Sequence, residues 1–447
     1  MVLVDDLKQI QRAALRAVDP ALAVKRFLSF EGGLLEVGQQ SWSFDTCGCV
    51  ILIAAGKAAV PMAEAAAAVL GSHLTQGVVV TKYKHAVQHT LTSSIMVVEA
   101  GHPVPDASGQ QGATLVARLL SDTKADDLVL VLISGGASAL LPLPVPGLSL
   151  SDLQAVTGLL LRSGATIVEI NTVRKHLSRL KGGQIARLAA PAAVLSLVLS
   201  DVVGDPLDVI ASGPTVPDPT TYADAWDILA RYGLTDKIPS NVSEHLRAGV
   251  HAQIAETPKP ADPLFEKVHT FIIGSNRLAA KAAVLEAERL GYQTLLLTTF
   301  VEGEAREVAK VAAALAKGVL VHGDPLKPPA CLVCGGETTV HVRGEGHGGR
   351  NQELALAAAL ALEGVAQVAV MALATDGTDG PTDAAGAIID GETIRRARLL
   401  GFDPYAALSN NDAYPLLEAA GALLRTGPTG TNVNDLLVIL ISEASSS

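Results

Sequence analysis

Short apolar runs recur along the first half of the chain, and each of them ends in a polar or glycine-containing segment. The runs cover residues 50–55, 77–81, 95–99, 128–133 and 193–199. Most of them are followed by a stretch in which apolar residues recur with helical spacing. This alternation predicts an α/β fold with a doubly wound, Rossmann-like parallel sheet. In such a sheet ligands bind beyond the carboxyl ends of the strands, which is where the polar residues fall.

The pattern weakens between residues 236 and 262, where three prolines occur among scattered polar residues. It resumes with an apolar run at 268–273, which is followed by a long alanine-rich helical stretch and further strand-like runs. We therefore predict two α/β domains joined by a linker. The predicted ranges are 1–240 for the N-terminal domain, 241–264 for the linker and 265–447 for the C-terminal domain.

Several elements of the C-terminal part can be predicted from its pattern. An alternating strand is expected at 338–342, and a last strand is expected at 436–441. The long apolar stretch at 354–374 is interrupted by Glu363 and Gly364, so it is read as a helix, a turn and a strand, and not as a membrane span.

The N-terminal forty residues carry a helical apolar pattern formed by Leu7, Ile10, Ala14 and Val18. Such a helix could pack on either domain, and the sequence leaves this open.

Composition and charge narrow the class of protein. Apolar residues make up 49% of the 447 residues, which is enough for a substantial core. The formal charge of −11 comes without a basic tract, which argues against nucleic acid or an anionic membrane as the main partner. The start of the chain lacks the basic residues and apolar run of a signal peptide, so we expect a soluble cytoplasmic protein, either a monomer or a homodimer.

The four cysteines are Cys47, Cys49, Cys331 and Cys334. The last two form a Cys-x-x-Cys in a short buried-strand pattern, and no suitably spaced pair of histidines lies nearby. We expect reduced core cysteines here, and not a zinc or redox site.

Lys57 lies where an apolar run gives way to a helical stretch, in Ala-Ala-Gly-Lys-Ala-Ala. A lysine in the first helical turn opposes the helix dipole, at a small cost if the side chain is solvated. A phosphate bound at the helix N-terminus would instead let this lysine and the free backbone amides act together. The segment is not a Walker A loop, because it lacks that motif's first glycine and its Ser/Thr after the lysine.

Other polar residues of the first half also follow apolar runs. The segment Ser134-Gly135-Gly136-Ala137-Ser138 offers backbone amides and two hydroxyls to a carboxylate or phosphate. Asp201 could act as a general base or as a partner of metal-bound water, or it could cap the next segment. Arg174 belongs to a basic face with Lys175, Arg179 and Lys181, which could also be only a solvated helix.

Four glycine-rich loops follow one another near the end of the chain, at 335–338, 344–353, 375–386 and 426–435. Arg350 follows four glycines and precedes a helical stretch, where its planar fork suits phosphoryl oxygens, although a structural ion pair is the alternative. Asp376 and Asp379 follow an apolar run and suit magnesium held through carboxylates and water. Glu337 ends a run in the same way, although it could also be a turn residue.

Taken together, these motifs resemble the class II glycerate kinases, in which a glycerate-kinase N-terminal domain joins a domain of the MOFRL type. The matching segments are 56–58, 101–106, 134–138, 171–178, 181–183, 200–205, 212–215, 303–306, 335–338, 348–353, 375–380 and 429–435. The resemblance implies transfer of phosphate from ATP to D-glycerate, giving 2-phosphoglycerate, with a divalent metal such as Mg²⁺. It also implies an active site in the cleft between the two domains, with Lys57 and Arg350 as essential cations.

On this basis we predict a role for each candidate residue. The predicted catalytic residues are Lys57, Arg350 and Asp201. The predicted substrate-binding residues are Ser134, Gly135, Gly136, Ser138, Arg174 and Asn432. The predicted nucleotide-binding residues are Gly274, Ser275, Asn276, Glu304, Gly348 and Gly349, and the predicted metal ligands are Glu337, Asp376 and Asp379.

Two other functions are weaker readings of the same residues. Members of this family are often labelled hydroxypyruvate reductases, but an NAD(P)H-dependent reductase needs a dinucleotide fingerprint. No Gly-x-Gly element here has the required third glycine and the acidic residue about 20 positions later. A non-catalytic sugar-phosphate-binding module would rest on the loop at 134–138 alone.

Overall fold

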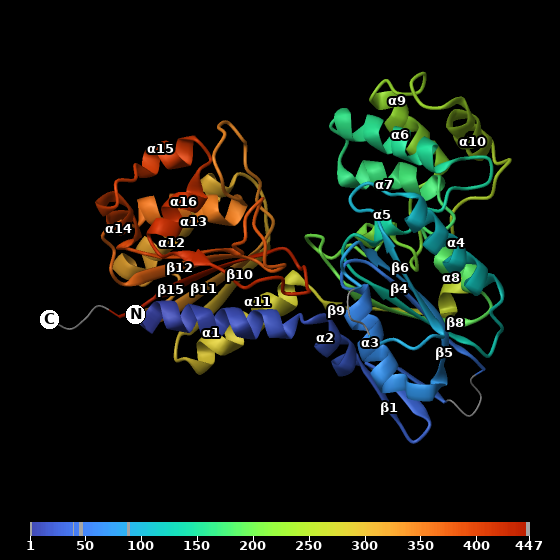
Figure 1. Cartoon of the computed structure of the whole chain (residues 1–447), viewed down its shortest axis with the longest axis horizontal. Helices are drawn as coiled ribbons and strands as arrows, with labels where there is room; N and C mark the ends of the chain where they lie inside the picture. The colour runs from blue at the N-terminus through green and yellow to red at the C-terminus, as the bar shows by residue number, and fades with distance from the viewer. Residues whose placement is uncertain (1, 39, 44–47, 87–89, 444–447) are drawn as a thin grey trace. The chain divides into compact units, whose positions relative to one another are not determined.

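The computed structural model describes residues 2–38, 40–43, 48–86 and 90–443. Its contacts divide the chain into two compact units. We call the unit formed by Pro20–Ser200 and Asp205–Ile273 the parallel-sheet unit. The mixed-sheet unit is formed by Met1–Asp19, Asp201–Gly204 and Gly274–Ser447. Each unit contains a six-stranded sheet covered by helices, so the predicted α/β class is confirmed (Figure 1).

The parallel-sheet unit is built on a sheet with the strand order β6-β5-β4-β7-β8-β9. Its strands are β4 (Val50–Ala55), β5 (Leu74–Lys82), β6 (Ile95–Ala100), β7 (Leu128–Ile133), β8 (Ala193–Leu199) and β9 (Val268–Gly274). Every pairing from β6 to β8 is parallel, as predicted. The central strands β4 and β7 are buried along their whole length, which explains why their sequences are continuous apolar runs.

Helices and a small antiparallel sheet complete this unit. The helices are α2 (Pro20–Phe27), α3 (Ala59–Leu70), α4 (Ala107–Ser121), α5 (Ala137–Leu140), α6 (Leu150–Arg162), α7 (Ile167–His176), α8 (Gln184–Ala189), α9 (Tyr222–Arg231) and α10 (Ser240–Val250). Short 3-10 turns occur at η2 (Gly71–His73), η3 (Ile210–Ser212) and η4 (Pro263–Lys267). The small sheet consists of β1 (Leu28–Glu31), β2 (Leu34–Val37) and β3 (Gln40–Ser43). Helices α6, α7, α9 and α10 share a second apolar core, and capping boxes start three of them.

The chain passes between the units at places that differ from the predicted boundary. Residues 241–264 belong to the parallel-sheet unit and include most of α10. The apolar run at 268–273 becomes β9, which adds to the edge of the parallel sheet beside β8 and does not open the second sheet as predicted. The physical reason is that the apolar residues of a strand show that it will be buried, but they do not show which of two sheets it will pair with.

The mixed-sheet unit has the strand order β10-β11-β15-β12-β13-β14. Its strands are β10 (Gln293–Val301), β11 (Ala330–Gly336), β12 (Val368–Ala374), β13 (Gly386–Asp390), β14 (Leu423–Leu424) and β15 (Asp435–Ile441). Only β10 and β11 pair in parallel, because β15 runs antiparallel between β11 and β12. The helices are α1 (Val2–Ala17), α11 (Asn276–Arg289), α12 (Ala305–His322), α13 (Arg350–Ala361), α14 (Thr393–Leu399), α15 (Pro404–Ser409) and α16 (Ala413–Ala419). Helices α1 and α11 lie on one face of this sheet, and α12 and α13 lie on the other (Figure 1).

The structure settles where the N-terminal helix packs. Leu7, Ile10, Ala14 and Val18 are fully buried, and α1 packs along α11 and against β12 and β15. The first helix of the chain therefore belongs to the mixed-sheet unit, whose other segments all follow residue 200 in the sequence.

The segment 338–342 does not form the strand that its alternation predicts, and only an isolated bridge joins Thr339 to Glu304. Its backbone amides are bound outside any ladder: the Thr339 amide donates to the Gly303 carbonyl, and the His341 amide donates to the Glu304 carboxylate. The prediction for 354–374 is confirmed, because α13 ends at Ala361 and β12 begins at Val368. Among the described residues, no helix is long and apolar enough to cross a membrane.

The cysteines of β11 are buried and free, as expected. Burial raises the pKa of Cys331 to about 12 and the pKa of Cys334 to about 11, so neither thiol ionises near neutral pH. Cys49 is also free, and Cys47 lies outside the described residues.

Candidate active site

Three carboxylates gather at one edge of the mixed sheet because of its strand directions. β11 ends at Gly336 and is followed by Glu337, and β12 ends at Ala374 shortly before Asp376. The antiparallel β15 begins between them, with Asp435 opposite both Gly336 and Ala374. The end of one strand, the end of another and the start of a third therefore bring these acidic residues to the same edge.

Arg350, the first residue of α13, binds two of these carboxylates. Its Nε lies 2.5 Å from Oδ2 of Asp435, and its Nη2 lies 3.0 Å from Oδ1 of the same residue. Its Nη1 lies 3.0 Å from Oε1 of Glu337. Burial alone would lower the pKa of Arg350, but the hydrogen bonds and charge of Asp435 and the charge of Glu337 raise it above its usual range. The guanidinium is therefore held in one orientation by two hydrogen bonds to Asp435 and an ion pair with Glu337.

Negative charge exceeds positive charge around this arginine. Burial raises the pKa of Glu337; the charge of Arg350 opposes this shift, and the charges of Asp435, Asp201 and Asp376 add to it. Burial also raises the pKa of Asp435, although its hydrogen bond with Arg350 acts in the opposite direction. One guanidinium does not balance four carboxylates, so the edge is suited to a further cation.

The predicted metal ligands differ in how well they fit such a cation. Among the described residues, no group of three His, Cys, Asp or Glu side chains is arranged to hold a metal ion. Asp376 is half-buried and Glu337 retains solvent exposure, so both are accessible. A protein commonly supplies only one or two carboxylates to Mg²⁺ when substrate phosphates complete the site. Glu337 and Asp376 fit that pattern.

Asp379 does not fit a metal site, because its carboxylate is used by the start of α13. Its Oδ1 accepts the Asn351 amide at 3.1 Å, and its Oδ2 accepts the Gln352 amide at 2.8 Å. Burial raises the pKa of Asp379 to about 6 despite these hydrogen bonds. A side chain on Gly349 would meet Asp379, because a Cβ there would lie 2.3 Å from Cγ of the aspartate. Asp379 and Gly349 thus fix the N-terminus of α13, and Arg350 with it.

The predicted nucleotide-binding residues lie at helix starts of the same unit. Ser275 caps α11 by accepting the Leu278 amide. Asn276 donates from Nδ2 to the carbonyls of Val433 and Asp435, at 2.9 and 2.8 Å, and so holds the start of β15. Glu304 precedes α12 and binds His341 at 2.8 Å.

The remaining predicted residues of this unit have local partners or open surroundings. Asn432 accepts the Asn434 amide at 3.1 Å in the turn before β15. Gly348 has space for a side chain, since a Cβ there would come no closer than 3.5 Å to its neighbours.

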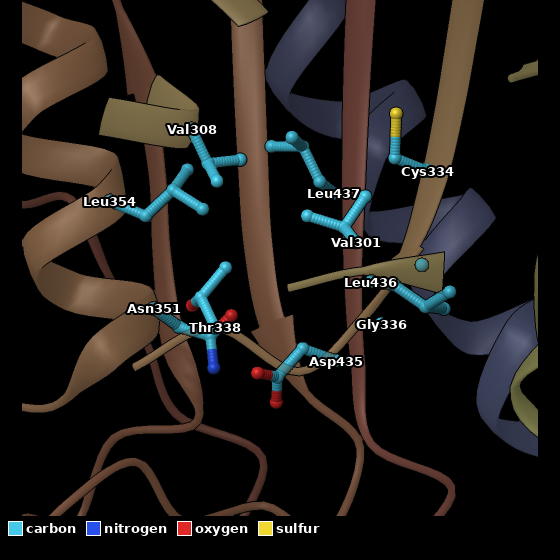
Figure 2. Close-up of a pocket in the computed structure, with 11 residues that line it drawn as sticks. Val301, Val308, Cys334, Gly336, Thr338, Asn351, Leu354, Asp435, Leu436 and Leu437 are labelled. Atoms are coloured by element: carbon cyan, nitrogen blue, oxygen red, sulfur yellow. The ribbon is translucent and has the colours of Figure 1, made fainter. Parts of the chain in front are cut away.

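A pocket lies beside Asp435 within the mixed-sheet unit (Figure 2). Apolar side chains of Val308, Leu354 and Leu437 form one end, and Thr338, Asn351 and Asp435 lie at the other. The Thr338 hydroxyl is buried and has no hydrogen-bond partner among the described residues. The pocket therefore offers a free hydroxyl next to the Arg350–Asp435 pair.

In the parallel-sheet unit, Lys57 follows β4 and the loop at 134–138 follows β7, the neighbouring strand. The Lys57 amide donates to the Gly135 carbonyl at 2.9 Å, and the Ala58 amide donates to Oγ of Ser134 at 3.0 Å. These two amides are therefore already bound within the protein and are not among those that a phosphate could use. The Lys57 side chain enters none of the ion pairs formed within the described part of the chain.

His102 belongs to the same group of residues. Gly136 has a φ of 88°, and a Cβ there would lie 2.9 Å from Cδ2 of His102, so the loop needs glycine to pack on the imidazole. Burial, followed by the charges of Lys57, Lys82 and His85, lowers the pKa of His102 to about 4. The imidazole is therefore neutral at pH 7 and leaves Lys57 as a nearby positive charge.

Arg174 and Ser138 are also brought together. Nη2 of Arg174 lies 3.2 Å from the Ser138 carbonyl oxygen. Sequence reasoning placed both residues among the substrate ligands but did not include Asp435. The signal for Asp435 was its place at the end of the 429–435 motif, directly before the last strand.

Comparison with known proteins agrees with these motifs. Residues 6–247 match a domain of unknown function (DUF4147), and residues 330–435 match the MOFRL family. A D-glycerate 2-kinase from Thermotoga maritima is 49% identical over 88% of this chain and 90% of its own length. The chain belongs to the MOFRL-type glycerate kinase family.

Other members of the family have different names. A relative from Agrobacterium vitis, 42% identical over 97% of this chain and 94% of its own, bears the provisional name hydroxypyruvate reductase. The crystal structure of a glycerate kinase from Thermotoga maritima matches with a TM-score of 0.88 at 45% identity, covering 98% of this chain and 99% of that chain. The fold is therefore shared along nearly the whole chain.

Proposed function

We propose that this chain is an ATP-dependent glycerate 2-kinase that converts D-glycerate to 2-phosphoglycerate. The observation that carries the proposal is the Arg350 guanidinium, held by Asp435 and Glu337 at an acidic strand edge. Phosphoryl transfer needs little covalent chemistry from the protein and depends on positioned cations, a metal and an oriented nucleophile. The family relationship and the site residues support the same reaction.

In the proposed reaction the C2 hydroxyl oxygen of D-glycerate bonds to the γ-phosphorus of ATP, and the bond from this phosphorus to the bridging oxygen of ADP breaks. Lys57 and Arg350 neutralise charge on the phosphoryl oxygens during the transfer. Asp201 accepts the proton of the hydroxyl. Its charge contributes to the raised pKa of Glu337, so it belongs to the same acidic group.

Glu337 and Asp376 would hold Mg²⁺ at the acidic edge. When bound, this ion neutralises phosphate charge that the surplus carboxylates would otherwise repel. The starts of three helices form the nucleotide side of the proposed site. Ser275 and Asn276 lie at the start of α11, Glu304 lies at the start of α12, and Gly348 and Gly349 lie at the start of α13.

The reductase alternative is less well supported by the strand-to-helix junction at Lys57. A dinucleotide enzyme uses free amides at such a junction to bind pyrophosphate. Here the Lys57 and Ala58 amides are already bound to the 134–138 loop. The sequence also lacks the glycine and acidic-residue spacing of that motif.

The experiment that tests the proposal compares both reactions on one preparation. Purified protein is incubated with ATP, Mg²⁺ and D-glycerate, and the product is identified by phosphorus NMR. In parallel it is incubated with hydroxypyruvate and NADH or NADPH. The Lys57→Ala/Arg350→Ala double variant, purified identically, controls for contaminating kinases.

We expect 2-phosphoglycerate from the unmodified protein alone. Reductase turnover without ADP formation would overturn the proposal. Absence of both activities, together with thermal stabilisation by a sugar phosphate, would favour the binding module.

A further inference from the structure

Two cations of the parallel-sheet unit converge on one oxygen atom. The Ser138 carbonyl accepts Nη2 of Arg174 at 3.2 Å and Nζ of Lys181 at 2.6 Å. Arg174 lies on α7, and Lys181 precedes the Gly182-Gly183 turn that leads into α8. Only 4% of the Lys181 surface is exposed.

Neither cation has a carboxylate partner in the described part of the chain. The neighbouring Lys175 shows the contrast, because its ammonium lies 3.3 Å from both Asp208 and Asp218. Burying an ion without a counter-ion is costly, and a neutral carbonyl offsets only part of that cost. Burial and the charge of Arg174 hold the pKa of Lys181 well below its usual range. The pair therefore lacks a counter-ion inside the protein, and an anion bound there would favour the charged form of Lys181.

Both cations keep hydrogen-bond donors for a ligand. An ammonium has three donors and a guanidinium has five, and the Ser138 carbonyl takes one from each. An anion with two oxygen atoms could accept from both groups at once.

The hydroxyl groups of Ser138 and Ser212 are held by other hydrogen bonds and have no hydrogen atom free to donate to an anion. Ser212 donates to Oδ1 of Asn171 at 2.9 Å, so the 2.8 Å contact between Ser138 and Ser212 has Ser138 as its donor. The Ser138 hydroxyl can then only accept hydrogen bonds from a ligand. Recognition of an anion here therefore depends on Arg174 and Lys181. These two cations take the substrate-binding role that was predicted for the Ser138 hydroxyl.

The backbone beneath these hydroxyls is held in an unusual conformation. Ala211 and Ser212 both have positive φ, at 52° and 63°, although neither is glycine. Positive φ is unfavourable for residues other than glycine, and residues with such strained conformations cluster at functional sites. The strained turn fixes Ser212 and, through it, Ser138.

We propose that Arg174 and Lys181 bind the carboxylate of the hydroxy-acid substrate. The proposal rests on the proposed function for the identity of that acid and adds Lys181 as a specificity-determining residue. In the proposed function the phosphoryl group is bound by Arg350 and Lys57, and the Lys57 amide donates to Gly135 of the 134–138 loop. The subsite explains why an acid, and not an uncharged polyol of the same size, would be the acceptor.

The test compares Lys181→Met, which keeps the length of the side chain and removes its charge, with Arg179→Met. Arg179 is exposed on the same segment and serves as the matched control. Steady-state kinetics are measured with D-glycerate and with its neutral amide, and the KM for ATP is measured in parallel.

We expect Lys181→Met to raise the KM for D-glycerate about 10- to 100-fold, the usual range for one lost charge-assisted hydrogen bond. The KM for ATP should stay unchanged, and the preference for D-glycerate over its amide should shrink by the same factor. Arg179→Met should match the unmodified protein. A purely structural role of Lys181 would change the kinetics of acid and amide equally, and that result would overturn the proposal.

Two further measurements keep the test decisive. If Lys181→Met does not fold, Arg174→Lys replaces it, and an unchanged preference for the acid over the amide in that variant counts against the subsite. If the unmodified protein does not phosphorylate D-glycerate, the proposed function fails, and calorimetric titration with D-glycerate then tests the subsite alone. Binding that is lost in Lys181→Met supports it, and absence of binding to the unmodified protein overturns it.

Discussion

Arg350 and Asp435 are joined by two hydrogen bonds, with Nε 2.5 Å from Oδ2 and Nη2 3.0 Å from Oδ1. The pair spans 85 residues of sequence and links the start of α13 to the start of β15. A carboxylate that holds a phosphate-binding arginine in place acts on the reaction through that arginine. Asp435 is therefore a positioning residue in the proposed mechanism.

Replacement of Asp435 by Asn should lower kcat more than it changes the KM for either substrate, because Arg350 loses its fixed orientation. The free energy of unfolding should fall by about 1–3 kcal/mol, since half of the bidentate pair is lost. Double-mutant cycles with Arg350→Lys, read by kcat and by urea unfolding, measure the coupling. Additive effects of the two substitutions would show that the pair does not act as a unit.

Removal of either proposed phosphoryl-binding cation should be severe for catalysis. Lys57→Ala and Arg350→Ala should each lower kcat by about 10²–10⁵, taking the known scale for a catalytic arginine as the upper limit. Arg350→Lys should recover little, because an ammonium cannot reproduce the two parallel hydrogen bonds to Asp435.

The two variants should differ in thermal unfolding. Lys57→Ala should keep its melting temperature, whereas Arg350→Ala leaves the buried Asp435 carboxylate unpaired and should lower it. Calorimetry distinguishes them, and equal melting temperatures would contradict the structural role of the Arg350 pair.

The metal proposal predicts different outcomes for two aspartates of the same loop. Asp376→Asn should raise the Mg²⁺ concentration needed for half-maximal activity, because one of two accessible carboxylates is lost. Asp379→Asn should leave the Mg²⁺ requirement unchanged and instead lower stability, since Asp379 accepts two amides of α13. Magnesium titrations of both variants decide this, and a shifted requirement in Asp379→Asn alone would reverse the assignment.

The proposed general base gives a further expectation. Asp201→Asn should lower kcat strongly while nucleotide affinity persists, because only the proton acceptor for the hydroxyl is lost. Equilibrium binding of ATP to the variant supplies the comparison. Retention of full kcat would place the base elsewhere.

Acid stability should depend on Glu256 of the parallel-sheet unit. Burial alone would raise its pKa, but the His176 ring 3.3 Å away, the Tyr222 amide and Lys259 lower it from 4.5 to about 2. Its ionised form therefore stabilises the fold above about pH 4.5, and this contribution is lost as the pH falls from there towards 2.

Glu256→Gln should remove that part of the pH dependence of urea unfolding. Glu244→Gln, at an exposed position of α10, is the matched control and should change nothing. An identical pH profile in Glu256→Gln and the unmodified protein would contradict the expectation.

Much of this architecture follows from the sequence alone. The runs at 50–55, 128–133 and 193–199 are strands with those bounds, because strands covered on both faces must be continuously apolar. The glycine loops and Arg350 are likewise visible in the sequence, since positive φ and close backbone approach demand glycine.

What only the tertiary structure decided is which partner each charged residue meets. The apolar residues of a strand determine neither its direction nor the sheet that it joins. The antiparallel direction of β15 and the position of β9 beside β8 could therefore not be predicted from the sequence. Asp379 and Asp435 both lie in glycine-rich motifs beside strands, yet one binds the amides of α13 and the other binds Arg350. Lys175 and Lys181 likewise belong to one basic segment, but only Lys175 meets carboxylates. These differences arise from distances of a few ångströms between segments far apart in the chain, and residue type and spacing do not encode such distances.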